Sequence, residues 1–175
     1  MKADYVIVGG GSAGCVLANR LSEDPGNQVL LIEAGGKDWN PLIHIPAGYM
    51  KLLDHPTLTW GFKADRNSGL NGREINYPRG RVLGGSSSIN GMIYIRSQPE
   101  DYDHWAQLGN RGWSSGDVLP YFNKSEKWQG PDKAAHSKDG LLYTSPSQDQ
   151  PELCQAAIEA GQQMGWDYRE DLNDL

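Results

Sequence analysis

The chain has 175 residues, with 16 lysine and arginine residues against 22 aspartate and glutamate residues, so its formal net charge at pH 7 is −6. This length accommodates one ordinary domain or part of a larger one, and the acidic balance argues against a nucleic-acid-binding protein. A mean hydropathy of −0.61 and the lack of a long apolar run argue against a transmembrane segment. Because no secretory-signal pattern is found, we expect a soluble, cytoplasmic protein.

The first 36 residues predict a strand, a helix and a second strand. Residues 4–8 are mostly apolar and precede a glycine cluster, which indicates a buried strand. Residues 12–21 have helical periodicity, and the apolar positions of one face are Ala13, Val16, Leu17 and Leu21. Residues 28–33 form a second apolar stretch. This order predicts a βαβ unit with parallel strands and a right-handed crossover.

The middle of the chain, residues 37–81, has no convincing periodicity and is interrupted by prolines. Stretches of this length without regular structure are typical of functional segments in compact domains. Within it, residues 67–73 have the composition of a turn, which we expect to join two short strands. A second glycine cluster follows at residues 80–88, and a short apolar run at residues 92–96.

Helices are expected to dominate the last part of the chain. The first covers residues 99–108 and stops at Gly109. A capping box beginning at Ser114 opens a second helix that continues to Glu126, with its inward positions at Val118, Leu119 and Phe122. Residues 129–150 are expected to be loops around one short strand at 141–143, and residues 151–164 form the last helix.

The first glycine cluster fits the pattern G-x-G-x-x-G between a predicted strand and a predicted helix, and Glu33 closes the next strand. In this pattern the glycines permit a tight turn and a close approach of the backbone to a pyrophosphate, which meets the positive end of the helix dipole. The carboxylate accepts hydrogen bonds from the ribose. We therefore predict that an adenine dinucleotide, NAD or FAD, contacts Gly9, Gly11, Ser12, Ala13, Gly14, Glu33 and Ala34.

Two long segments carry a more specific signal: residues 4–36 (DYVIVGGGSAGCVLANRLSEDPGNQVLLIEAGG) and residues 77–96 (YPRGRVLGGSSSINGMIYIR). Together they resemble the glucose–methanol–choline (GMC) oxidoreductase family, which binds FAD, and most closely its choline and aliphatic alcohol dehydrogenase branch. The match continues through residues 101–105, 112–113 and 118–122. The resemblance implies an α/β fold, namely the Rossmann-like FAD-binding βαβ unit of a GMC-type FAD/NAD(P)-binding domain, incomplete in this chain.

The resemblance also implies how FAD is held. One group of residues would lie along the pyrophosphate and the ribityl chain: Arg81, Val82, Gly84, Gly85 and Ser86. A second group would lie beside the isoalloxazine ring, where backbone N–H groups can bond flavin N5 or O4: Asn90, Gly91, Met92 and Ile93. Some family members attach the flavin covalently through a histidine of this motif. Here that position is Ile89, so we predict a non-covalently bound FAD.

The chain lacks the part of the family that carries the catalytic histidine, so no catalytic residue is assigned and those residues are expected beyond Leu175. We expect residues 1–135 to be the N-terminal part of the FAD-binding domain and residues 136–175 to begin the substrate-binding domain. A second polypeptide is expected to carry the C-terminal part of the enzyme. The histidines are scattered with no assigned role, Asp103 is read as a solvated charge, and no metal site is predicted.

The expected function is the oxidation of a small-molecule alcohol to an aldehyde, with hydride transfer to the flavin. Two alternatives stay open. An NAD-dependent dehydrogenase would share the glycine pattern of residues 9–14 but would leave the motif of residues 81–90 unexplained. A non-catalytic nucleotide-binding or interaction module would keep the fold without the activity.

Overall fold

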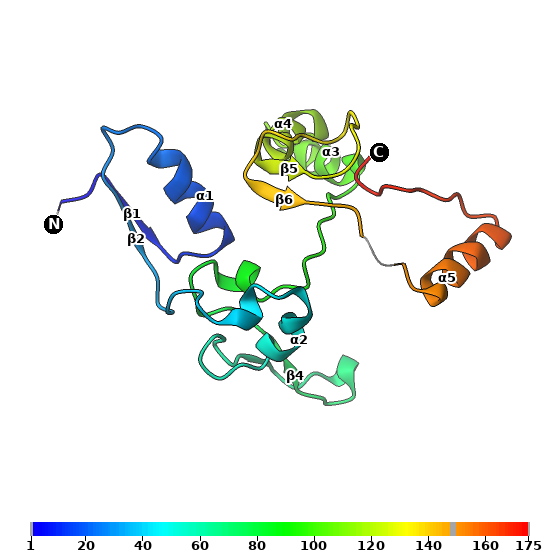
Figure 1. The fold of residues 1–175 in the computed structure, drawn as a ribbon, viewed down its shortest axis with the longest axis horizontal. Helices are drawn as coiled ribbons and strands as arrows, with labels where there is room; N and C mark the ends of the chain where they lie inside the picture. The colour runs from blue at the N-terminus through cyan, green and yellow to red at the C-terminus, as the bar shows by residue number, and fades with distance from the viewer. Residues whose placement is uncertain (1, 148–149, 175) are drawn as a thin grey trace. The chain divides into compact units, whose positions relative to one another are not determined.

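The computed structural model describes residues 2–147 and 150–174, and the chain forms two compact units, Met1–Ile93 and Tyr94–Leu175 (Figure 1). Every residue of the predicted FAD site belongs to the first unit. The expected division at residues 135/136 refers to the domains of the complete enzyme and stays a prediction. Among the described residues, no helix has both the length and the apolar character that a membrane span requires.

The first unit begins with the predicted βαβ arrangement: β1 (Tyr5–Val8), α1 (Ser12–Leu21) and β2 (Val29–Ile32) (Figure 1). The two strands are parallel, with Tyr5 opposite Val29 and Val8 opposite Ile32. The helix has the bounds that its periodicity predicts, because the glycine cluster before it and the turn after it define both ends. The α/β prediction is therefore confirmed in this part of the chain.

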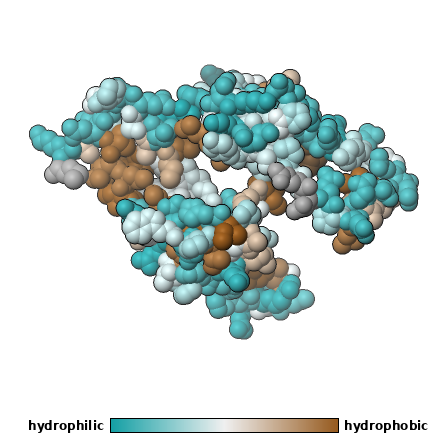
Figure 2. Space-filling view, viewed as in Figure 1, coloured by the Kyte–Doolittle hydropathy of each residue, from teal (hydrophilic) through white to brown (hydrophobic). Residues whose placement is uncertain are grey.

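The burial predicted for the first strand is wrong. Of the residues of β1 only Ile7 is buried, while Val8 is 83% exposed. The apolar side chains of β1, α1 and β2 gather into a surface patch, brown in Figure 2. A two-stranded parallel sheet with one crossover helix has too few elements to cover its own apolar faces, since parallel sheets are normally covered on both sides.

The proline-rich middle of the chain forms short elements: η1 (Pro41–Ile43), η2 (Pro46–Gly48), α2 (Tyr49–Leu52), β3 (Lys63–Ala64), η3 (Ser68–Leu70), β4 (Ile75–Asn76) and η4 (Gly85–Ser88). Strands β3 and β4 are antiparallel and flank residues 67–73, so the predicted turn is confirmed. A small core holds this region together; it consists of Leu52, Leu58, Val82 and Ile89, with Leu42 and Ile43 against it.

The second unit contains α3 (Pro99–Gln107), α4 (Ser115–Ser125), β5 (Glu126–Trp128), β6 (Leu142–Thr144) and α5 (Glu152–Gln163). The predicted capping box is present, because Ser114 Oγ accepts from the Asp117 N–H at 3.3 Å and the Asp117 carboxylate accepts from the Ser114 N–H at 3.1 Å. Strand β5, which pairs in parallel with β6, was not predicted.

Two smaller predictions for this unit are also corrected. Asp103 is not a solvated charge, since its carboxylate accepts hydrogen bonds from both the N–H and the hydroxyl of Ser115, each at 2.9 Å. These bonds tie α3 to the first turn of α4. Leu119 does not point into a core but is 44% exposed, whereas Val118 and Phe122 are half-buried.

Candidate dinucleotide-binding site

The first glycine loop joins β1 to α1 through a close contact that only glycine permits. Gly9 has a φ of +97°, in the left-handed region, and its N–H donates to the Ile32 carbonyl at 2.7 Å. Gly14 is buried in the first turn of α1, and a Cβ at this position would overlap the Gly9 carbonyl oxygen. The loop therefore brings the start of the helix directly against the end of the strand.

The N-terminus of α1 is open to an anion. Gly11 occupies the N-cap position, where it offers no capping side chain, and the first turn contains no acidic residue. The first N–H groups of a helix have no partner within the helix, and the helix dipole adds partial positive charge there. The N–H groups of Ser12 and Ala13 are consequently placed to bind a phosphate oxygen, as the pattern of residues 9–14 predicts.

The second glycine cluster lies directly on the first. The Gly84 N–H donates to the Gly10 carbonyl at 2.7 Å, and the Leu83 N–H donates to the Gly36 carbonyl at 2.9 Å. A Cβ on Gly85 would lie 2.8 Å from the Cα of Gly11, closer than real Cβ atoms come. Two segments far apart in the sequence thus form one surface of bare backbone next to the open end of α1.

Glu33 holds the two glycine turns in place. Its carboxylate accepts from the Gly10 N–H at 2.6 Å and from the Gly35 N–H at 2.8 Å. An ionised carboxylate has further lone pairs, so these two bonds leave room for the predicted hydrogen bonds to a ribose. Positioning of the loop is a role of Glu33 that the sequence pattern did not indicate. Ala34, beside it, is exposed.

The residues of the second cluster differ in what they offer a ligand. Val82 is fully buried in the small core, so only its backbone is available. Gly84 and Gly85 both have positive φ values, +91° and +56°, which let the chain turn tightly over the first loop. Arg81 is exposed, with its guanidinium 5.0 Å from the Trp60 ring, and the Ser86 hydroxyl accepts from the Gly80 N–H at 3.1 Å.

The segment predicted to line the flavin ring, residues 90–93, is exposed and has no helix or strand. Met92 has a φ of +58°, unusual for a residue with a side chain, and its N–H donates to Asn90 Oδ1 at 3.0 Å. This N–H is therefore already engaged, which leaves the N–H groups of Gly91 and Ile93 for a ligand. Ile89, just before the segment, is 2% exposed and fixed in the core.

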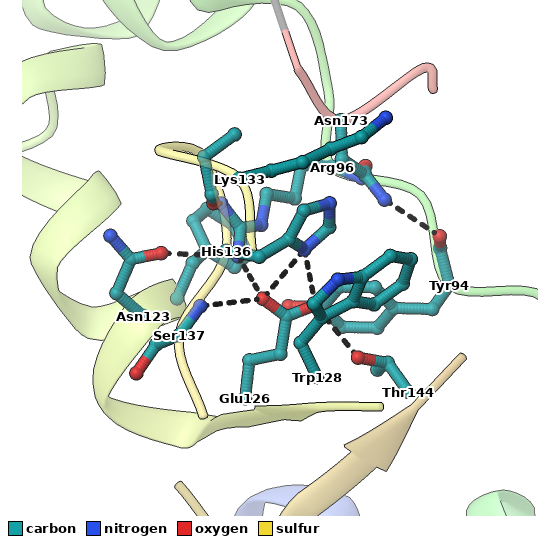
Figure 3. A network of polar contacts seen from close by, with 12 residues as sticks. Tyr94, Arg96, Asn123, Glu126, Trp128, Lys133, His136, Ser137, Thr144 and Asn173 are labelled. Atoms are coloured by element: carbon teal, nitrogen blue, oxygen red, sulfur yellow. Dashed lines mark hydrogen bonds and ion pairs between the residues drawn. The ribbon is translucent and has the colours of Figure 1, made fainter. Parts of the chain in front are cut away.

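A second group of polar residues, in the Tyr94–Leu175 unit, was missed by the sequence analysis (Figure 3). The Glu126 side chain is 0% exposed and accepts from Arg96 Nη2 at 2.8 Å and from the Thr144 hydroxyl at 2.8 Å. His136, 1% exposed, has Nδ1 2.9 Å from Glu126 and Nε2 2.8 Å from Asp171 Oδ2. Its ring stacks on Trp128, with the ring centroids 3.9 Å apart.

No local pattern could have indicated this network. Its members are separated by long stretches of sequence, and each one alone is typical of a surface residue. The signal that distinguishes them is burial together with pairing, since buried charges in proteins are almost always paired.

The network makes the stability of the protein sensitive to acid. Burial raises the pKa of the Asp171 carboxyl, but hydrogen bonds from the Asn173 N–H and His136, with the charges of His136 and Lys133, outweigh burial and hold this pKa below its ordinary value. Ionised Asp171 therefore stabilises the folded state above the ordinary aspartate pKa of about 4, and this contribution is lost as the pH falls through the lower, folded-state pKa.

We accordingly expect the free energy of unfolding to fall as the pH drops below about 4, and to fall less steeply in Asp171→Asn, which has no carboxyl to protonate. Urea unfolding of both proteins over a series of pH values measures this difference. Identical slopes for the two proteins would contradict the role given to Asp171.

A parallel βαβ unit, an open helix N-terminus and a second glycine segment packed on the first define a Rossmann-like dinucleotide-binding region. The chain belongs to the GMC oxidoreductase family, whose description it matches over residues 3–174. Members of this family bind FAD. The resemblance that the two long motifs carry is therefore confirmed.

Relatives of known identity agree with this assignment. The chain is 46% identical to an oxygen-dependent choline dehydrogenase of Rhizobium etli and 45% identical to one of Brucella ovis, covering 99% of this chain and 32% of each relative. The crystal structure of pyridoxine 4-oxidase from Mesorbium loti matches with a TM-score of 0.91 and 39% identity over 99% of this chain and 34% of that one. A formate oxidase matches with a TM-score of 0.87, at 28% identity over 98% of this chain and 32% of that one.

The chain thus spans about a third of the length of the curated relatives that it matches.

Proposed function

We propose that the protein to which this chain contributes is an FAD-dependent oxidoreductase that oxidises the CH–OH group of a small alcohol to an aldehyde. The observation that carries the proposal is the contact between the two glycine segments, in which the Gly84 N–H bonds the Gly10 carbonyl at 2.7 Å. An NAD site requires only the first segment. An NAD site would leave the second segment, which packs on the first, without an explanation, whereas the FAD-binding family to which the chain belongs accounts for it.

The residues present fit such a cofactor. Glycine backbone lies beside the N-terminus of α1: Gly11 is its N-cap residue, and a Cβ on Gly85 would come within 2.8 Å of the Gly11 Cα. Ser12 and Ala13 offer N–H groups to the pyrophosphate, Glu33 offers its carboxylate to the ribose, and Gly91 and Ile93 offer N–H groups to the flavin ring. When bound, FAD supplies the acceptor for the hydride that leaves the carbinol carbon.

We assign the catalytic residues to the part of the protein that lies outside this chain. A histidine beyond Leu175 would take the hydroxyl proton of the alcohol, as general bases do in such oxidations. The exposed apolar patch over β1, α1 and β2 supports the presence of a further part, because a patch of this kind normally marks a surface that another polypeptide segment covers. We propose that the C-terminal part of the enzyme, as a continuation or a second chain, covers it.

We further propose that the FAD is bound non-covalently. Position 89, where some family members carry an attachment histidine, holds an isoleucine whose side chain is fixed in the small core with Leu52 and Val82. It has no nucleophilic atom to offer. Denaturation of the purified flavoprotein followed by filtration should release all yellow colour into the filtrate; colour retained with the polypeptide would contradict non-covalent binding.

The activity is tested by anaerobic spectroscopy of the purified protein together with its C-terminal part. Addition of choline, and separately of pyridoxine and benzyl alcohol, should bleach the oxidised flavin band with at least one of these alcohols. If flavin is bound but no alcohol bleaches it, the reaction assigned here is wrong. If the bound cofactor is a nicotinamide dinucleotide, or if no cofactor binds, one of the two alternatives above replaces it.

A further inference from the structure

One arginine of the second glycine cluster, Arg81, is held by an aromatic side chain. Its guanidinium lies over the Trp60 ring, 5.0 Å from the ring centroid. Trp60 in turn stacks on Phe62, with the ring centroids 5.9 Å apart and the ring planes within 4° of parallel. The three side chains therefore make consecutive contacts within the Met1–Ile93 unit, to which the predicted FAD site also belongs.

The pairing of two backbone segments brings Trp60 and Arg81 together. Beyond β3 and β4 the antiparallel hydrogen bonds continue, since the Trp60 N–H donates to the Arg79 carbonyl at 2.9 Å and the Arg81 N–H donates to the Leu58 carbonyl at 2.7 Å. Leu58 is itself buried in the small core. The contact between Trp60 and Arg81 is thus set by the register of the folded backbone and does not depend on two surface side chains meeting by chance.

The backbone of Arg81 lies directly against the predicted dinucleotide site. A Cβ on Gly35 would overlap the Arg81 carbonyl group, and the Gly35 N–H donates to the Glu33 carboxylate at 2.8 Å. The next residue, Val82, is fully buried in the core. The Cα of Arg81 therefore has a fixed position beside the turn that Glu33 holds, and only the direction of its side chain remains to be set.

The guanidinium of Arg81 keeps its hydrogen-bond donors available. An arginine stacks on an aromatic ring through the face of its guanidinium, whereas its N–H groups lie in the plane and point outward. Arg81 takes no part in the ion pairs described for this unit, which are Arg20–Glu23, His44–Asp38 and Lys63–Glu74. A cationic group with free donors beside glycine backbone fits a phosphate, which arginine can bind through two parallel hydrogen bonds.

We propose that Trp60 is a positioning residue for the dinucleotide: by holding the Arg81 guanidinium over its ring, it directs this group to the pyrophosphate of FAD. A free arginine side chain would give up its rotamer freedom when the cofactor binds, and the contact with Trp60 removes part of that cost in advance. The proposal rests on the proposed function, because it needs a dinucleotide at the two glycine segments.

The same part of the chain provides a matched control. Arg79 lies over the Tyr77 ring, 4.3 Å from its centroid, and its Nη2 donates to the Tyr77 hydroxyl at 2.6 Å. This pair also consists of an exposed arginine on an exposed aromatic ring. Its arginine, however, is not the residue whose backbone packs against Gly35, and one of its donors is already engaged.

The test is a double-mutant cycle on FAD affinity, measured by quenching of the flavin fluorescence in the protein with its C-terminal part. Arg81→Ala should weaken FAD binding about thirtyfold, as expected for lost hydrogen bonds between charged groups. Trp60→Leu should weaken it about fivefold, within the range of a cation–π contact, and Trp60→Phe should restore most of that loss. Combined with Arg81→Ala, Trp60→Leu should have no further effect, because the group that it positions is gone.

A second readout needs no cofactor. Because the Arg81 guanidinium lies over the Trp60 ring, the ring current should shift the NMR resonance of the Arg81 Nε–H, and Trp60→Leu should remove this shift. Trp60 is 45% exposed, so the unit is expected to stay folded in the variant. An Nε–H resonance that is the same in both proteins would show that the contact is not kept in solution, which would overturn the proposal.

The control variants Arg79→Ala and Tyr77→Leu should bind FAD as the wild type does. Three outcomes overturn the proposal and leave the proposed function intact: wild-type affinity in Arg81→Ala, an equal loss in Arg79→Ala and Arg81→Ala, or an effect of Trp60→Leu that is the same with and without Arg81. If the wild-type protein binds no FAD, the proposed function fails first, before any variant is compared, and Trp60 loses its assigned role with it.

Discussion

Gly35→Ala is expected to weaken FAD binding strongly, whereas Gly36→Ala, one residue further on, should leave it unchanged. A Cβ on Gly35 would overlap the backbone of Arg81 and Val82, which cannot move aside as a flexible side chain could. A Cβ on Gly36 would meet no heavy atom within 4 Å. The first substitution pushes the second glycine segment away from the turn that follows β2, and thereby away from the first glycine segment, while the second adds the same methyl group in open space.

We expect Gly35→Ala to cost about 3 kcal/mol of folding free energy, at the upper end of the usual cost of overpacking, and to weaken FAD binding by about a hundredfold. Titration of both variants with FAD, followed by quenching of the flavin fluorescence, measures the affinity. Equal affinities for Gly35→Ala and Gly36→Ala would show that the contact between the segments does not form the site.

Glu126→Gln is expected to destabilise the second unit strongly. The side chain is fully buried between Arg96 and His136, so the substitution leaves the buried Arg96 guanidinium facing a neutral amide. Breaking a buried ion pair by removal of one partner costs about 3–5 kcal/mol. For a domain at the lower end of the usual range, about 5 kcal/mol, this removes most of the folding free energy.

The matched control is Glu74→Gln, which also removes a carboxylate that pairs with a cation, Lys63, at 2.7 Å, but on the exposed surface. Exposed ion pairs contribute little, so no measurable change is expected. Urea unfolding followed by circular dichroism compares the two variants with the wild type. A midpoint for Glu126→Gln within experimental scatter of the control would contradict the role of Glu126 as the centre of the network.

Local sequence patterns predicted the elements whose causes are local. The bounds of α1, the capping box at Ser114 and the turn at residues 67–73 each depend on residues a few positions apart. The glycine pattern at residues 9–14 also predicted where α1 begins, because it lies between a strand and a helix in the sequence.

The remaining features depend on contacts between distant residues. Val8 is exposed because too few neighbouring elements cover β1. The composition of β1 alone does not reveal how many elements cover it. The sequence of β5 is short and contains two charged residues, so it does not by itself predict a strand. The strand forms because β6 pairs with it. The burial of His136 needs Glu126 and Asp171 to meet around it, and Glu33 acquires its contact with Gly10 only after the chain has folded back.

The central claim is that the two glycine segments together hold one FAD, and a native mass spectrum of the purified protein tests it most directly. We expect a species that contains this polypeptide and one FAD per copy, with or without a C-terminal part, and the loss of the FAD mass on denaturation. A protein that is folded and carries no flavin, even after incubation with excess FAD, would contradict it.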